Sequence, residues 1–142
     1  MRLGKSLALL FLTFVASVAH AEVYNYLITR VVDGDTVEIK VDWLPKELGD
    51  RLKIRIYGVD TPEKGGRAKC AQEAKLGDEA TKFTVEAIYN AENLGVTIRE
   101  WDKFGGRILG DVLIDGKSLR ELLIERGYAR EYFGAVKKSW CN

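Results

Sequence analysis

The pattern of hydrophobic and polar positions predicts strands in the first half of the chain. Residues 24–32 are rich in aromatic and β-branched side chains and end at an Asp-Gly-Asp turn, after which residues 36–41 alternate. This pair predicts a β-hairpin. Residues 51–57 alternate basic and apolar side chains with a period of two, which predicts a third strand with one buried face.

In the second half of the chain, the spacing of apolar residues first indicates a helix, then two strands and then a second helix. Over residues 71–91, apolar side chains recur every three or four positions, which predicts a helix. Residues 95–101 and 108–114 are two further strand candidates, and residues 118–127 combine a Ser-x-x-Glu capping box with a final glycine. This order predicts an α+β, mainly β fold: a five-stranded OB-type barrel with two to three helices packed on it.

The N-terminus has the pattern of a secretory signal. A basic start precedes a mostly apolar run at residues 7–18 and an Ala-His-Ala cleavage pattern at 19–21. The alternative is a retained membrane anchor, but a span needs roughly 20 apolar residues. We expect cleavage of residues 1–21, with residues 22–142 forming one exported domain, periplasmic or extracellular, with no membrane anchor. Nothing in the pattern indicates more than a monomer.

The residue types restrict the chemistry. The chain has 22 Lys and Arg, 21 Asp and Glu, and a single histidine, His20, which lies in the predicted signal. A mature chain without histidine excludes Ser-His-Asp and Cys-His hydrolases and HExxH metalloproteases. Hydrolytic chemistry would have to come from carboxylates, arginines, hydroxyls and a hard metal ion.

The two cysteines, Cys70 and Cys141, bear on the compartment. In an exported chain we expect them to form a disulfide that ties the C-terminus to the middle of the domain. The alternative is a pair of buried thiols. A zinc site has no support, because the sequence has no Cys-x-x-Cys pair.

Three clusters of charged residues lie at predicted strand ends and turns. Residues 33–36 are either part of a metal site or an ordinary hairpin turn. Arg55 with residues 60–63 is either a ligand set for a hard cation or a turn with a surface ion pair. Residues 102–107 either bind phosphate through arginine and close backbone approach, or form a glycine hairpin with a solvated arginine.

Together the three clusters fit phosphodiester hydrolysis. That reaction needs a metal to neutralise the phosphate, a base to activate water and cations to stabilise charge developing at phosphorus. Two aspartates, one glutamate and two arginines meet these needs without histidine.

The same residues resemble the staphylococcal nuclease (thermonuclease) family. Its first motif is similar to Val-Asp-Gly-Asp-Thr at residues 32–36, and its second to Arg55 followed by Val-Asp-Thr-Pro-Glu at 59–63. Its third is similar to residues 102–107 followed by Ile-Leu-Gly-Asp-Val at 108–112. The resemblance implies an OB barrel that binds nucleic acid and cuts DNA and RNA with low sequence specificity, leaving 3′-phosphate ends.

The resemblance also implies a metal site. It assigns one Ca²⁺ ion to the side chains of Asp35 and Asp60 and to the backbone carbonyl of Thr61. Asp33 is expected to support the site without ligating the ion.

The remaining expected roles concern water and substrate. The resemblance implies that Glu63 activates or orients the attacking water and that Arg55 and Arg107 bind the scissile phosphate. Lys103 belongs to a local basic patch and Tyr132 offers a stacking surface, so both are candidates for substrate contacts. The alternative for Tyr132 is packing of a C-terminal tail.

Two departures from the family pattern fall in the third motif. Gly105 and Gly106 stand where the family usually has one glycine, so the placement of Arg107 is open. Phe104 stands where the family typically has tyrosine and therefore lacks a hydroxyl. The alternative function is a non-catalytic OB module that binds single-stranded nucleic acid or a protein partner, and it predicts binding without cleavage.

Overall fold

The computed structural model describes residues 21–142. The predicted signal at residues 1–21 lies outside this range apart from its last residue, and so does His20. The strands of the main sheet are β1 (Val23–Tyr24), β2 (Ile28–Asp33), β3 (Thr36–Lys40), β4 (Arg51–Ile56), β6 (Leu94–Trp101), β7 (Arg107–Ile114) and β8 (Lys117–Ser118). A two-stranded ladder pairs β5 (Val59–Asp60) with β9 (Arg130–Glu131).

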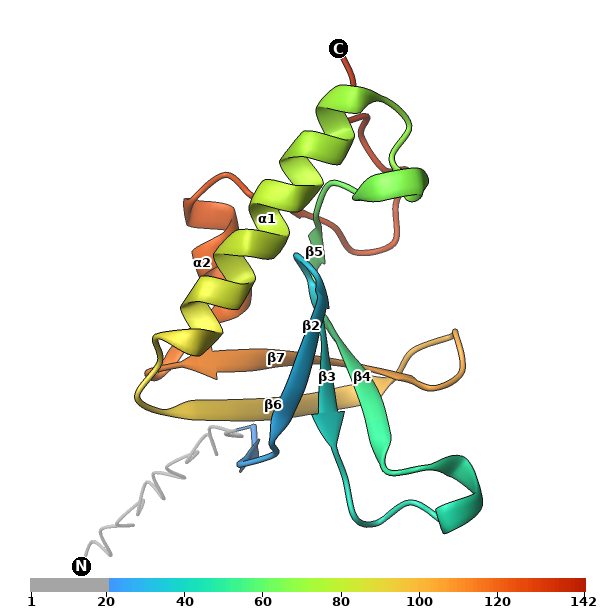
Figure 1. The fold of residues 1–142 in the computed structure, drawn as a ribbon, viewed down its shortest axis with the longest axis vertical. Coiled ribbons are helices and arrows are strands. Elements are labelled where there is room, and N and C mark those ends of the chain that lie inside the picture. The colour runs from blue at the N-terminus through green and yellow to red at the C-terminus, as the bar shows by residue number, and fades with distance from the viewer. Residues whose placement is uncertain (1–20) are drawn as a thin grey trace, which may run out of the picture.

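The helices of the described range are α1 (Ala71–Tyr89) and α2 (Leu119–Glu125), with short 3₁₀ turns η1 (Lys46–Leu48) and η2 (Gly65–Arg67). Figure 1 shows α1 lying across one end of the strands, with α2 beside it. None of the helices in residues 21–142 is long and apolar enough to cross a membrane.

The main sheet follows the path β1-β6-β7-β4-β3-β2, with β8 paired to β7. β4 and β7 run parallel, and the other neighbours in the path are antiparallel. β1 and β2 lie at opposite ends of this path although only residues 25–27 separate them in the chain. The sheet therefore curls back on itself through this stretch, which confirms the predicted mainly β, OB-type fold.

The core lies inside the curled sheet and beneath the helices. On β4, Leu52, Ile54 and Ile56 are buried while Lys53 and Arg55 lie on the other face, as the alternating pattern predicts. Each fully buried aliphatic side chain contributes roughly 1.5–3 kcal/mol relative to exposure. This packing fixes the strand register, because a slip of one residue would turn the basic side chains into the core.

Both helices begin at a side-chain cap. The hydroxyl of Ser118 accepts a hydrogen bond from the backbone N–H of Glu121, as the predicted capping box requires. At α1, the Cys70 Sγ accepts from the backbone N–H of Glu73. α1 ends at Tyr89, two residues before the predicted end.

The C-terminal segment returns to the beginning of α1 (Figure 1). A disulfide joins Cys70, the residue that caps α1, to Cys141, 71 positions later. The end of the chain is thereby fastened close to the loop between β5 and α1.

Candidate active site

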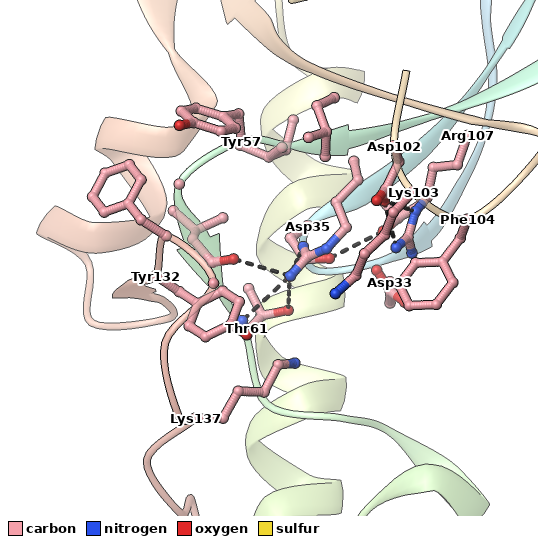
Figure 2. A pocket seen from close by; sticks show the side chains of 18 of the residues that line it. Asp33, Asp35, Tyr57, Thr61, Asp102, Lys103, Phe104, Arg107, Tyr132 and Lys137 are labelled. Carbon is pink, nitrogen blue, oxygen red and sulfur yellow. Dashed lines mark hydrogen bonds and ion pairs between the residues drawn. The ribbon is translucent and has the colours of Figure 1, made fainter. Parts of the chain in front are cut away.

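A cleft of about 640 Å³ opens beside the outer face of β4. Figure 2 shows Asp35 and Thr61 near its centre, between Lys103 and Arg107 on one side and Tyr132 on the other. The predicted site residues that line this cleft are Asp33, Asp35, Arg55, Thr61, Glu63, Lys103, Arg107 and Tyr132. Asp60 borders a smaller adjoining cavity of about 260 Å³, which Thr61 and Glu63 also line.

Strand register explains why the two predicted arginines share a face. The parallel pairing of β4 with β7 sets Arg107 opposite Lys53, and Arg55 follows two positions later on β4. Residues two apart on a strand point to the same side. Both guanidinium groups therefore reach the cleft although 52 positions separate them in the chain.

Asp35 forms the centre of a buried polar cluster. Its Oδ2 lies 2.5 Å from Arg55 Nη1 and accepts hydrogen bonds from the Thr61 hydroxyl at 2.9 Å and the Thr61 backbone N–H at 3.3 Å. The Thr36 hydroxyl donates to Asp35 Oδ1 at 3.0 Å. These contacts join the β2–β3 turn to the segment after β5, so two motifs that are distant in sequence form one site.

Burial and charge oppose each other in this cluster. Burial raises the pKa of Asp35 above its usual value and the Asp33 carboxylate adds to the effect, whereas Arg55 and the threonine hydroxyls oppose it. For Arg55, burial lowers the pKa, but the neighbouring carboxylates, Asp35 first, raise it overall. Arg55 therefore stays charged in the site.

Asp60 is contacted by the C-terminal segment. Its side chain is only 6% exposed, and Oδ2 accepts a hydrogen bond from the Trp140 indole Nε1–H at 3.0 Å. The Lys137 ammonium approaches Oδ1 at 2.5 Å, but not along a hydrogen-bond direction, so this buried oxygen accepts no aligned hydrogen bond. Sequence reasoning did not find either contact on Asp60, because 77 and 80 positions separate the partners.

Glu63 is the most accessible carboxylate of the second motif, with 38% of its side chain exposed. Its Oε2 lies 3.3 Å from Arg67 Nε, and Arg67 Nη2 donates to Asp33 Oδ2 at 2.9 Å. The backbone N–H of Glu63 donates to the buried carboxylate of Glu73 at 3.3 Å. Glu63 thus has a fixed backbone and a side chain that water can reach.

Small residues allow α1 to pack closely against the β2–β3 turn and against the backbone of Glu63. A Cβ at Gly77 would overlap the backbone carbonyl of Glu63, and one at Gly34 would lie 2.9 Å from the Cβ of Ala80. The buried Thr84 hydroxyl donates to the Gly34 carbonyl at 2.7 Å. A glycine within a helical pattern is all that marks Gly77 in the sequence, because these roles depend on close approach of backbone in three dimensions.

The third motif forms a compact ion pair. Asp102 Oδ2 accepts from Arg107 Nε at 2.6 Å and lies 2.6 Å from Arg107 Nη2, and the Arg107 guanidinium carbon stands 5.2 Å from the centre of the Phe104 ring. Gly106 has φ +74°, which glycine adopts without strain. The second glycine is therefore accommodated in the loop, and Arg107 still reaches the cleft.

The acidic residues do not form a preassembled metal cage. Within residues 21–142, no group of three or more His, Cys, Asp or Glu side chains is placed to hold a metal ion. Asp35 faces Arg55, and Asp60 faces Lys137. Each of the two candidate carboxylate ligands thus has a cationic partner within the protein.

The curled sheet and this cleft of paired acids and arginines define an OB-fold protein with a polar site suited to phosphate chemistry. Residues 53–140 match the profile of the family described as staphylococcal nuclease homologue. The chain belongs to this family.

Several curated proteins are similar over most of this chain. Endonuclease YncB of Bacillus subtilis is 33% identical over 111 residues, which cover 75% of this chain and 47% of that protein. The SPbeta prophage-derived endonuclease YokF of the same organism is 32% identical over 114 residues, which cover 77% of this chain and 34% of that protein. The thermonuclease of Staphylococcus hyicus is 32% identical over 119 residues, or 83% and 65%. The chain thus spans about half or less of the first two relatives.

Proposed function

We propose that this chain is an exported nuclease that hydrolyses phosphodiester bonds of DNA and RNA with low sequence specificity and leaves 3′-phosphate ends. The observation that carries the proposal is the shared cleft, in which Arg55 and Arg107 face the accessible Glu63 and the buried Asp35. Family membership and the endonuclease and thermonuclease names of the relatives support it. The disulfide supports an oxidising compartment, and we propose a monomer.

The residues present fit one hard divalent cation, which we propose to be Ca²⁺. Asp60 Oδ1 is a buried carboxylate oxygen with no aligned hydrogen bond, and a cation there would replace the Lys137 ammonium that lies 2.5 Å away. Asp35 and Asp60 with the Thr61 carbonyl supply oxygen donors, which Ca²⁺ prefers. Such an ion, when bound, would neutralise phosphate charge and lower the pKa of water.

The two arginines would bind the phosphate and stabilise the charge that develops on it. Asp102 engages the Nε and one Nη of Arg107, which orients the guanidinium and leaves its other Nη for a phosphate oxygen. Arg55 is held by Asp35 and by a hydrogen bond from Nη2 to the Val59 carbonyl at 3.0 Å. Groups already oriented in this way need little reorganisation during the reaction.

Glu63 would accept the proton from the attacking water. It is accessible, its backbone is held by Glu73, and Arg67 pairs with its carboxylate. Residues 21–142 contain no histidine to take this role. When a phosphate enters, Arg67 is able to exchange the carboxylate for the substrate, because its side chain is 60% exposed.

The experiment that tests these assignments is replacement of Glu63 by Gln. We expect kcat to fall by about 10²- to 10⁴-fold with little change in folding, because the amide keeps the shape but cannot accept the proton. Glu79→Gln is the matched control, since Glu79 is an exposed residue of α1 outside the cleft. Near-normal cleavage by Glu63→Gln would reject its role, and binding without cleavage by the unmodified chain would favour a non-catalytic module.

A further inference from the structure

The C-terminal segment contributes directly to the surroundings of Asp60. We call residues 137–141 the C-terminal strap. The strap places two groups on one buried carboxylate: the Trp140 indole N–H donates to Oδ2, and the Lys137 ammonium forms an ion pair with Oδ1. An Asp that is 6% exposed and touched on both oxygens by one short segment depends on that segment for its orientation.

Three contacts fasten the strap. The disulfide ties Cys141 to Cys70 at the start of α1. Arg130, which pairs with Asp60 in the β5–β9 ladder, stacks its guanidinium 3.6 Å from the centre of the Trp140 ring. Arg130 Nη1 also donates to the Ser139 carbonyl at 2.9 Å. Trp140 is therefore held against the strand that carries Asp60.

The Trp140 indole and the Lys137 ammonium respond differently to a cation that approaches Asp60. The indole N–H is neutral and directed at Oδ2, so it neither repels a cation nor occupies Oδ1. The ammonium carries a full positive charge at the oxygen that has no aligned hydrogen bond, on a flexible side chain that is 44% exposed. The ammonium is thus able to leave, whereas the indole is fixed.

We infer that Trp140 is a positioning residue for the metal ligand Asp60, and that Lys137 is a tethered counter-ion that a divalent cation displaces from the same carboxylate. The inference rests on the proposed function, because it concerns the cation proposed there. The disulfide also contributes to the site, because it keeps Trp140 in contact with Asp60. Hydrogen bonds that orient a ligating group tune metal affinity strongly.

Calcium binding measured by isothermal titration calorimetry tests the inference without relying on activity. Trp140→Phe retains a ring for Arg130 to stack on but lacks the N–H, so we expect Ca²⁺ affinity to fall by about 10- to 100-fold. Lys137→Met removes the competing charge, and we expect affinity to rise by about fivefold to tenfold. Effects of opposite sign are expected only if the two residues act on the carboxylate itself.

Trp43→Phe is the matched control. Trp43 donates to the Tyr26 hydroxyl at 3.0 Å and lines neither cavity, so its replacement should leave Ca²⁺ affinity unchanged. Terbium provides a proximity readout, because its luminescence is excited by energy transfer from a nearby indole. We expect tryptophan-excited Tb³⁺ luminescence to persist in Trp43→Phe and to fall in Trp140→Phe, in which Trp101 of the larger cleft remains as a more distant donor.

The role of the disulfide is tested in the Lys137→Met variant. Without the Lys137 charge, a change in Ca²⁺ affinity reports only on how the disulfide holds Trp140 in place. There, Cys70→Ser with Cys141→Ser should weaken Ca²⁺ binding, and adding Trp140→Phe should change it by less than about twofold, since coupled residues are not additive. An additive loss would overturn the role of the disulfide.

The outcomes separate this inference from the proposed function. Unchanged Ca²⁺ affinity in Trp140→Phe, or weaker binding in both Trp140→Phe and Lys137→Met, would overturn the proposed role of the strap. The proposed metal site would not be affected by either result. Absence of Ca²⁺ and Tb³⁺ binding in the unmodified chain, or binding that Asp60→Asn leaves unchanged, would overturn the proposed metal site and the strap with it.

Discussion

The two walls of the cleft are built in different ways. The β6–β7 wall, residues 101–107, is closed by local contacts, and its ion pair joins Asp102 to Arg107 across five positions. The C-terminal wall, residues 132–141, borders both the cleft and the adjoining smaller cavity. It depends on contacts with partners 71 and 80 positions away. The side that carries Arg107 can therefore form with its own hairpin, whereas the side that touches Asp60 forms only when the whole chain has folded.

Among the variants that distinguish the two walls, Arg107→Lys in the β6–β7 wall should change activity most. Arg107→Lys keeps the charge but loses the planar fork that pairs with Asp102, so we expect kcat to fall by about 10²- to 10³-fold. Steady-state kinetics on single-stranded DNA measures this change, with Arg126→Lys at the exposed end of α2 as the matched control. Equal activity of the two variants would remove Arg107 from the site.

Loss of the disulfide should lower the stability of the C-terminal wall. Cys70→Ser with Cys141→Ser opens a loop spanning 71 positions, and we expect the free energy of unfolding to fall by about 2–4 kcal/mol. Denaturant titration measures the loss. Hydrogen exchange should rise in residues 132–141 and remain unchanged in residues 101–107, and equal increases in both would contradict the difference between the walls.

A smaller effect is expected at the paired glycines of the local wall. Gly106 has φ +74°, so Gly106→Ala should cost about 1–2 kcal/mol of stability and displace Arg107. Gly105 lacks a positive φ, and a Cβ there meets nothing within 4 Å, so Gly105→Ala is the matched control with little expected change. Thermal unfolding and kcat of both variants distinguish the two positions, and equal losses would contradict the assignment.

The smallest expected effect concerns substrate affinity. Lys103 lines the cleft, and Lys103→Ala should weaken DNA binding to a similar extent for different sequences and reduce the salt slope of binding by about one. Fluorescence anisotropy at several salt concentrations measures the slope. Lys117→Ala on β8 is the control outside the cleft, and an identical slope in both variants would exclude a phosphate contact by Lys103.

The difference between the walls also explains what the sequence could predict. The hairpin of β2 and β3, the alternation of β4 and the capping box of α2 depend on neighbouring residues, and the structure confirms them. The parallel pairing of β4 with β7 leaves no local pattern. β9 is two residues long and has no alternation to recognise.

The candidate site likewise combines short sequence motifs with contacts between distant residues. Its three charged motifs were visible because each is short in sequence, and the structure brings their charged residues to one cleft, except Asp60, which borders the adjoining cavity. Gly77 packs against Glu63 from within a helix, and Trp140 reaches Asp60 from the end of the chain. Both contacts depend on the packing of α1 and the strap, which no short-range pattern encodes.

The most direct test of the central claim is incubation of residues 22–142 with single-stranded DNA in Ca²⁺ and in EDTA, followed by analysis of fragment lengths and end groups. We predict fragments with 3′-phosphate ends in Ca²⁺ and intact DNA in EDTA. Intact DNA under both conditions, with the protein folded and its disulfide formed, would contradict the proposed nuclease activity.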